Sequence, residues 1–187
     1  MKRIYLIRHG QPEFPGGKRL CIGSTDLPLS AEGMAQAQAM ARTLPAVAAV
    51  YASPLRRAAQ TARAICSDFT VLDGLRELDC GQWEGLDFAR IRRDYPALYA
   101  ARADDPSLQP PGAESQDAGL ARFFAAMAEA AQESPGDLAV VAHGGITALF
   151  LERVTGRWYK PQYCEVVRLV WDGRGFYQQE ETPCDKC

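Results

Sequence analysis

The apolar residues of this chain alternate between two periods. Short, almost wholly apolar runs predict strands at 2–7, 46–52, 70–72 and 137–142, and apolar residues spaced by three and four predict helices at 30–44, 53–65, 115–133 and 145–154. Ser30, Ser53 and Ser115 are expected to cap the first three of these helices. Two later runs, at 165–171 and 175–179, flank Asp172-Gly173 and predict a hairpin.

This alternation predicts a single domain over residues 1–187 of the α/β class, a three-layer α/β/α sandwich with a mostly parallel central sheet and an antiparallel edge. The segment at about 81–115 interrupts it with aromatic residues and prolines, so we expect a short cap insertion over one end of the sheet. We expect a flexible tail from about residue 180. Its cysteines, Cys184 and Cys187, supply only two of the four ligands that structural zinc prefers.

Composition narrows the class of protein and its partners. Hydrophobic residues make up 47% of the 187 positions and charged residues 24%, as in ordinary globular proteins, and no apolar stretch approaches the roughly 18 residues of a membrane span. The net charge of −2 provides no basic field for nucleic acid. Arg8 interrupts the first apolar run too early for a signal peptide, and the six cysteines are expected to stay reduced. We therefore expect a cytoplasmic protein with neither nucleic-acid nor membrane partners. Its oligomeric state does not follow from the sequence.

The two histidines of the chain, His9 and His143, each follow a predicted strand and precede a glycine. Ligands of open α/β sheets bind outside the carboxyl ends of the strands, so both imidazoles are expected in one crevice. A lone histidine is more often structural, but two in equivalent positions favour a functional site. Gly10 and Gly144 allow the backbone to approach a ligand closely, and we predict both as substrate-binding.

Arginines accompany the histidines. Arg8 precedes His9, and Arg56 is predicted on the first turn of a helix, where the N-terminus favours anions and a guanidinium matches phosphate oxygens. The alternative is that Arg56 and Arg57 are solvated surface charges. Two arginines and two imidazoles without a metal-ligand cluster favour a phosphoryl-binding site.

Five ordered motifs resemble those of the histidine phosphatase superfamily, also called the phosphoglycerate mutase-like family. The resemblance covers about residues 2–154. It implies a reaction that needs no Mg²⁺ or other cofactor. The motifs are Leu6-Ile7-Arg8-His9-Gly10, the stretch from Gly23 to Gly33, Ser53-Pro54-Leu55-Arg56-Arg57, Glu77 ahead of Gly81-Gln82-Trp83-Glu84-Gly85, and His143-Gly144-Gly145.

The resemblance implies that His9 is the nucleophile and forms a phosphohistidine, with Arg8, Arg56 and His143 around the phosphoryl oxygens. His9 must be unprotonated to attack, whereas His143 serves best as a protonated donor, so the two rings need different environments. Glu77 matches the acid/base carboxylate of the family, with Glu84 as the competing candidate.

Further substrate contacts are expected from two segments. Gly23 and Ser24 belong to the first, and Glu114 and Ser115 to a segment similar to a Gly-Glu-Ser motif, but with an extra alanine. Gln11 stands where the family often has Glu, and no catalytic role is assigned to it.

Other phosphatase and nucleotide-binding chemistries lack their motifs here. None of Cys21, Cys66, Cys80 and Cys164 has an arginine six positions later, and neither a P-loop nor a dinucleotide-binding glycine motif is present. The sequence therefore favours a metal-independent phosphomonoesterase that acts on a small phosphorylated metabolite. The stretches 21–29 and 81–85 look most like α-ribazole phosphatases and broad-specificity relatives, so α-ribazole 5′-phosphate is a candidate substrate. The alternatives are a phosphoglycerate mutase and a non-catalytic phospholigand-binding module.

Overall fold

Six strands form one central sheet in the computed structural model, which describes residues 1–178. Their order is β3-β2-β4-β1-β5-β6; the first four run parallel, and β5 is antiparallel to both β1 and β6. The mostly parallel sheet with an antiparallel edge is therefore confirmed. The strands are β1 (Lys2–Arg8), β2 (Ala49–Ala52), β3 (Thr70–Val71), β4 (Leu138–Ala142), β5 (Val166–Trp171) and β6 (Phe176–Gln178); the helices are α1 (Ala31–Thr43), α2 (Arg56–Ile65), α3 (Phe88–Asp94), α4 (Pro96–Asp104), α5 (Gln116–Glu133) and α6 (Gly144–Thr155).

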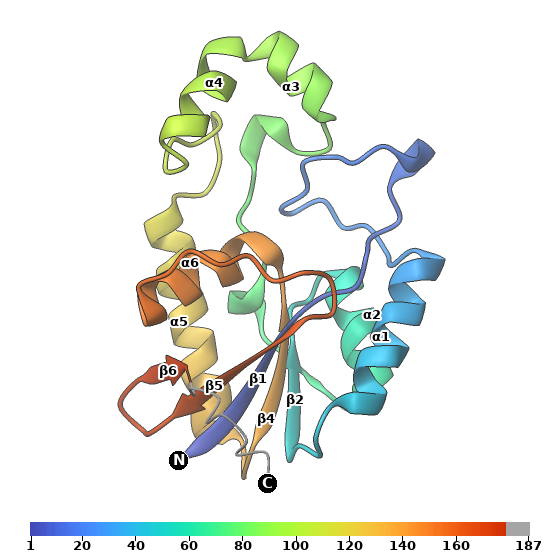
Figure 1. Ribbon diagram of the computed structural model, residues 1–187, viewed down its shortest axis with the longest axis vertical. Helices are drawn as coiled ribbons and strands as arrows, with labels where there is room; N and C mark the ends of the chain where they lie inside the picture. Colours follow the sequence, from blue (N-terminus) through green and yellow to red (C-terminus); the bar gives the residue numbers. More distant parts are fainter. Residues whose placement is uncertain (179–187) are drawn as a thin grey trace, which may run out of the picture.

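Helices cover both faces of the sheet, with α1 and α2 on one side and α5 and α6 on the other (Figure 1). The alternation of side chains along β1 explains why two layers are needed. Ile4 and Leu6 join a hydrophobic cluster that includes Phe123 of α5, whereas Tyr5 and Ile7 face a separate cluster on the side of α1 and α2. The predicted three-layer sandwich is thus the observed fold.

The register of the two central strands places the chain segments that follow them side by side. Ile7 lies opposite Val141 and Arg8 opposite Ala142 in the parallel pair β1–β4, and the amide of His9 donates a hydrogen bond to the carbonyl of Ala142 at 3.0 Å. The next residues on the two strands therefore leave the sheet at the same edge.

The segment between β3 and α5 includes two helices above that edge, α3 and α4, drawn at the top of Figure 1. They pack lightly. Ile91 is the one buried residue of α3, and α4 buries none. Trp83, at the end of the 3₁₀ turn Gly81–Trp83, is 5% exposed and packs beside Tyr95 and Tyr99. We call residues 81–115 the cap.

One predicted helix start is wrong. α2 begins at Arg56, and Pro54 lies outside it. The hydroxyl of Ser53 does not cap the helix, because it lies 2.7 Å from Nε2 of His143 and accepts a hydrogen bond from the amide of Leu55. Ser30 and Ser115 do cap α1 and α5, as predicted.

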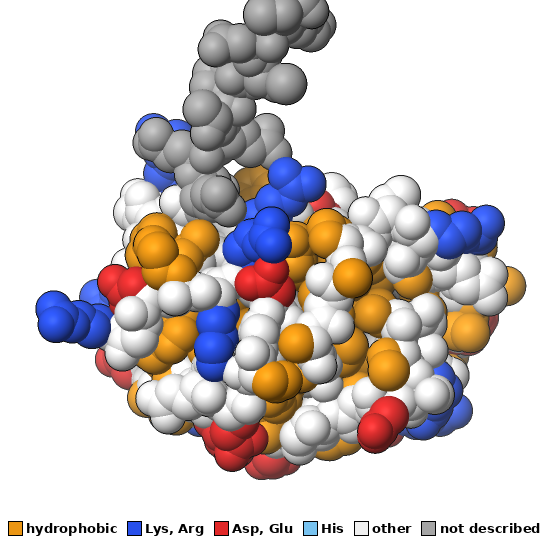
Figure 2. All heavy atoms as spheres, turned by 90° about the horizontal axis from the view of Figure 1, so that it is seen from below, with side chains coloured by type: hydrophobic (Ala, Val, Ile, Leu, Met, Phe, Trp, Pro, Cys, Tyr) orange, Lys and Arg blue, Asp and Glu red, His pale blue; other side chains and the backbone are white. Residues whose placement is uncertain are grey.

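The opposite end of the molecule has a different character. Figure 2 views it from below and shows basic and acidic side chains interspersed, with no histidine in sight. Within residues 1–178, no helix is long and apolar enough to cross a membrane. The predicted tail, with Cys184 and Cys187, lies outside the described residues.

Candidate active site

His9 is held rigidly at the carboxyl end of β1. It is 4% exposed, and its Nδ1 lies 2.6 Å from the carbonyl oxygen of Gly10. With the proton on Nδ1 donated to that carbonyl, the lone pair is on Nε2, which has no hydrogen-bond partner within the described residues. Gly10 is required here, because a Cβ at this position would lie 2.5 Å from the carbonyl oxygen of Gly33.

His143 faces His9 from the end of β4. The ring centroids are 5.0 Å apart and the ring planes are inclined by 59°. His143 is fully buried; its Nε2 contacts the Ser53 hydroxyl at 2.7 Å, and its Nδ1 has no hydrogen-bond partner among residues 1–178. The two strand ends therefore bring both imidazoles together, as predicted.

Arg8 brings a guanidinium to the same edge. Its Nη1 donates to the carbonyl of Pro161 at 2.7 Å, and its Cζ lies 4.1 Å from the ring centroid of Tyr163. A Cβ at Gly144 would lie 2.9 Å from Nε of Arg8, so the absence of a side chain at Gly144 makes room for the arginine.

The arginine of α2 whose charge acts on both imidazoles is Arg57, whereas Arg56 was predicted for the site. Arg56 is exposed on the first turn of α2, and its amide donates to Asp26 at 2.6 Å. Arg57 is fully buried, and its Nη1 and Nη2 donate to the carbonyls of Thr25 and Gly23, each at 2.8 Å. Its Nε is buried without a partner in the described part of the chain. The structure therefore favours Arg57 over Arg56 as the second arginine beside the histidines. We call Arg8, His9, Arg57 and His143 the basic cluster.

Burial and the neighbouring positive charges lower the pKa of both imidazoles. Burial lowers the pKa of His9 well below its ordinary value, and the positive charges of Arg57 and Arg8 lower it further. Burial also lowers the pKa of His143 strongly, followed by the charges of Arg57 and of its neighbours. The pKa values of both rings are thus shifted in the same direction, toward the neutral form. A bound dianion would favour the charged form of His143.

Glu77 lies at the N-terminus of α6, directly beside the basic cluster. Its Oε2 accepts from the amide of Gly145 at 2.7 Å, and its Oε1 from the amides of Ile146 and Leu78 at 2.7 and 3.0 Å. The amides of Gly145 and Ile146 belong to the first turn of α6 and have no acceptor inside the helix, and the helix dipole favours an anion at this end. Glu77 is half-buried, so water reaches the side chain that the amides hold in place.

Arg122 of α5 fixes the segment that bears Glu77. It donates hydrogen bonds to the carbonyls of Gly74, Arg76 and Glu77 at 2.7–3.0 Å. The carboxylate of Glu114 accepts from the same guanidinium at 2.7 and 2.6 Å. Glu114, predicted as a substrate contact, is therefore engaged in an ion pair that holds Arg122, although it also lines the pocket described below.

Glu84 is committed to a loop rather than to the basic cluster. Its carboxylate accepts from the amides of Gly23, Ser24, Thr25 and Cys80 at 2.8–3.1 Å, and from the hydroxyl of Thr25. Burial alone would raise the pKa of Glu84, but these hydrogen bonds outweigh it and hold the pKa low.. All its partners lie in this loop and at Cys80, and none belongs to the basic cluster, so Glu84 is a poor acid/base candidate. The amides of Gly23 and Ser24, both predicted as substrate contacts, donate to this carboxylate. The side chain of Ser115, also predicted as a substrate contact, accepts from the amide of Ala118 at the N-terminus of α5.

A pocket of about 450 Å³ opens between the cap and the loop held by Glu84. Small-molecule sites have about this size. Its walls are partly aromatic, from Trp83, Phe88 and Tyr99, and it is also lined by Arg102 and Lys160. We call it the cap pocket. A Cβ at Gly144 would lie 3.0 Å from Cε of Lys160, so this side chain links the cap pocket to Arg8 and the basic cluster.

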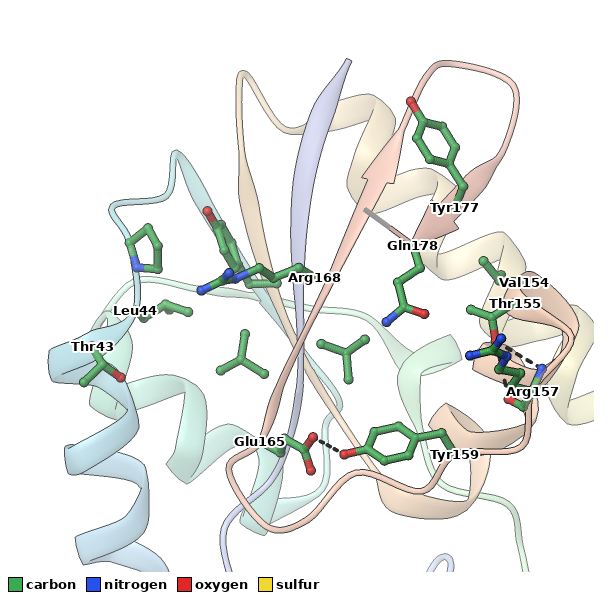
Figure 3. A pocket seen from close by; sticks show the side chains of 14 residues that line it. Thr43, Leu44, Val154, Thr155, Arg157, Tyr159, Glu165, Arg168, Tyr177 and Gln178 are labelled. Carbon is green, nitrogen blue, oxygen red and sulfur yellow. Dashed lines mark hydrogen bonds between the residues drawn. The ribbon is translucent and has the colours of Figure 1, made fainter. Parts of the chain in front are cut away.

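A wider hollow of about 1210 Å³ lies beside β5 (Figure 3). Residues from the end of α1, the end of α6 and β5 line it, and a hydrogen bond joins Tyr159 to Glu165 within it. It contains no member of the basic cluster and does not include Glu77, so we do not assign the chemistry to it. In residues 1–178, no group of three or more His, Cys, Asp or Glu side chains is placed to hold a metal ion.

Comparison with known proteins identifies the family of the chain. Residues 4–180 match the model of the histidine phosphatase superfamily (branch 1). The chain belongs to that superfamily.

Three similar proteins show the extent of the likeness. A bifunctional protein of Mycobacterium tuberculosis is 37% identical over 160 residues, 82% of this chain, and the chain spans only 41% of that protein's length. The glucosyl-3-phosphoglycerate phosphatase of Mycobacterium tuberculosis is 33% identical over 164 residues, which cover 79% of this chain and 72% of that protein. The crystal structure of the α-ribazole phosphatase from Shigella flexneri superposes with a TM-score of 0.81 at 25% identity, covering 95% of this chain and 94% of the other.

Several residues of the site escape sequence reasoning. Helical phase could have identified Arg57, because it lies on the same face of α2 as the buried Ala58, Thr61 and Ala62, whereas Arg56 does not. Nothing in the local sequence points to Arg122 or Lys160. Their contacts are with segments far away in the chain.

Proposed function

We propose that this protein is a phosphomonoesterase that hydrolyses a small phosphorylated metabolite through a phosphohistidine on His9. The observation that supports it best is the convergence of the basic cluster: the buried ring of His9 lies 5.0 Å, between centroids, from the ring of His143, and the charges of Arg57 and Arg8 act on it. Phosphoryl transfer requires an aligned nucleophile and fixed positive charge around the equatorial oxygens.

In the first half-reaction, Nε2 of His9 attacks phosphorus and the bond from phosphorus to the ester oxygen breaks. The hydrogen bond from Nδ1 to Gly10 stabilises the positive charge that develops on the ring. Arg8, Arg57 and His143 hold the phosphoryl oxygens. Glu77 gives its proton to the departing alkoxide, and the alcohol leaves.

In the second half-reaction, Glu77 accepts a proton from a water molecule that attacks the phosphohistidine. The bond from nitrogen to phosphorus breaks, inorganic phosphate leaves, and His9 and Glu77 return to their starting protonation states. No step requires a metal ion or another cofactor.

The proposed substrate is a phosphomonoester whose alcohol part enters the cap pocket. α-Ribazole 5′-phosphate remains a candidate, supported by the likeness to an α-ribazole phosphatase and by the aromatic side chains of Trp83, Phe88 and Tyr99. We also propose a cytoplasmic location, which is supported by the free thiols of the four described cysteines.

The test is hydrolysis of p-nitrophenyl phosphate with EDTA present, by the wild type and by His9→Ala. We expect turnover that survives chelation and is lost in the variant, with thermal melting as the control for folding. Activity that depends on added metal, or that persists in His9→Ala, would contradict the proposal. Conversion of 3-phosphoglycerate to 2-phosphoglycerate without phosphate release would instead indicate a mutase, and silence on a broad panel that includes α-ribazole 5′-phosphate would indicate a binding module.

A further inference from the structure

Two cations line the cap pocket without a carboxylate of their own. Lys160 makes no hydrogen bond or ion pair with any residue in 1–178. Its side chain packs over Gly144 next to Arg8, as the 3.0 Å approach to Cε indicates. Packing around the ammonium lowers the pKa of Lys160, and the nearby charge of Glu77 opposes that effect. An ammonium held in this position is able to bind an anion at the inner side of the pocket.

Arg102 is the second cation. It extends from α4 of the cap, and its Cζ lies 5.5 Å from the ring centroid of Trp83. Stacking on an indole orients a guanidinium while leaving its N–H groups free to donate. No hydrogen bond or ion pair to Arg102 is formed by the residues that the structure describes.

The acidic groups of the pocket do not cancel these two charges. Glu114 is already paired with Arg122 at 2.6 Å. Asp79 accepts the amide of Gly81 at 2.6 Å and forms no ion pair in the described chain. With Glu114 neutralised, Lys160 and Arg102 outnumber Asp79, and the basic cluster adjoins the pocket through Lys160.

We propose that the cap pocket selects phosphomonoesters whose alcohol part carries a carboxylate, which Lys160 and Arg102 bind. This inference rests on the proposed function and adds a substrate class to it. The phosphoryl group meets the basic cluster, the carbon chain crosses the aromatic wall, and the carboxylate reaches the two cations. Lys160 and Arg102 are then specificity-determining residues.

The test uses two pairs of substrates that differ in the carboxylate alone. 3-Phosphoglycerate is compared with glycerol 3-phosphate, and O-phosphoserine with O-phosphoethanolamine. The quantity measured is the ratio of kcat/KM for the carboxylate member to that for its partner. We expect the wild type to favour the carboxylate member of each pair, and the preference to shrink when NaCl is raised, since salt screens charges that solvent reaches.

Variants that remove one positive charge each show which side chain causes the preference for the carboxylate. Lys160→Met is expected to lower the ratio about tenfold to a hundredfold, the effect of losing one hydrogen bond between charged groups. Arg102→Gln is expected to lower it about threefold to tenfold, because glutamine loses the charge but still offers an N–H donor. Arg92→Gln is the matched control, because Arg92 is exposed on α3 of the same cap and does not line the pocket. It is expected to leave the ratio unchanged.

Three results would overturn the inference. The wild type has equal kcat/KM for both members of each pair, Lys160→Met lowers both members equally, or Arg92→Gln changes the ratio as much as Arg102→Gln does. Titration of the same compounds into His9→Gln, which lacks the nucleophile, measures the preference as a ratio of Kd values. Failure of the proposed function has a different signature, because the wild type would then not hydrolyse p-nitrophenyl phosphate.

Discussion

The basic cluster and the cap lie next to each other but are built differently. His9, Arg57 and His143 are buried, and they are held by strand register and by bonds to backbone carbonyls. The cap contributes α4, which buries no residue, and its pocket is partly lined by exposed side chains such as Phe88 at 39%. In the function that we propose, the chemistry common to many substrates takes place on the rigid part, and substrates are discriminated by a part that is packed loosely.

The largest expected difference between the two regions is in local stability. Amides of β4, whose residues are all buried, should exchange with solvent only on global unfolding, whereas those of α4 exchange by local opening. Hydrogen exchange followed by mass spectrometry should therefore show β4 exchanging at least about 10³-fold more slowly than α4. Equal protection of β4 and α4 would show that the cap is as rigid as the sheet.

The next largest effect separates two adjacent arginines. Arg57→Gln should lower kcat/KM about 10²–10³-fold on every substrate, as the loss of one preorganised donor does. Arg56→Gln, its matched control on the exposed side of α2, should stay within about twofold, since surface changes away from a site have small effects. Arg57→Lys keeps the charge but loses the hydrogen-bonding fork, and melting curves of all three check the loop that Arg57 holds. Equal losses in Arg56→Gln and Arg57→Gln would contradict the assignment.

Glu77→Gln should cost about 10²-fold on an alkyl phosphate, at the lower end for general acid catalysis. Its loss should be smaller on p-nitrophenyl phosphate, because nitrophenolate leaves without being protonated. Steady-state rates on the two substrates check this difference. Losses of equal size would mean that Glu77 positions α6 and does not transfer a proton.

The smallest effect concerns pH. The pKa values of His9 and His143 are lowered in the folded protein, so the unfolded chain binds more protons below its ordinary histidine pKa of about 6.5. The contribution of the two neutral rings to the free energy of unfolding is therefore fully present above this pH. It is lost as pH falls through it, by about 1.4 kcal/mol per histidine at pH 5.5. Urea unfolding at pH 7.5 and 5.5 should show a smaller loss in His143→Gln than in the wild type. Identical losses would contradict the burial of an uncharged ring.

Sequence reasoning recovers the rigid part better than the cap. Strand alternation and the glycines after His9 and His143 were enough to predict the sheet and the meeting of the two imidazoles, because both depend on local periodicity and parallel register. The error at Arg56 arose from placing the start of α2 at Ser53, whose hydroxyl instead contacts His143. Lys160 was beyond reach, since its placement depends on a loop from another part of the chain packing over Gly144.

The central claim is that His9 carries the phosphoryl group between the two half-reactions. Its most direct measurement is a rapid acid-free quench of the wild type during turnover, followed by proteolysis and mass spectrometry of the modified peptide. The account predicts one added phosphoryl group on His9, stable in base, labile in acid and absent from His9→Ala. A phosphoryl group on any other side chain would contradict it. So would the absence of a phosphoenzyme during turnover, together with activity retained in His9→Ala.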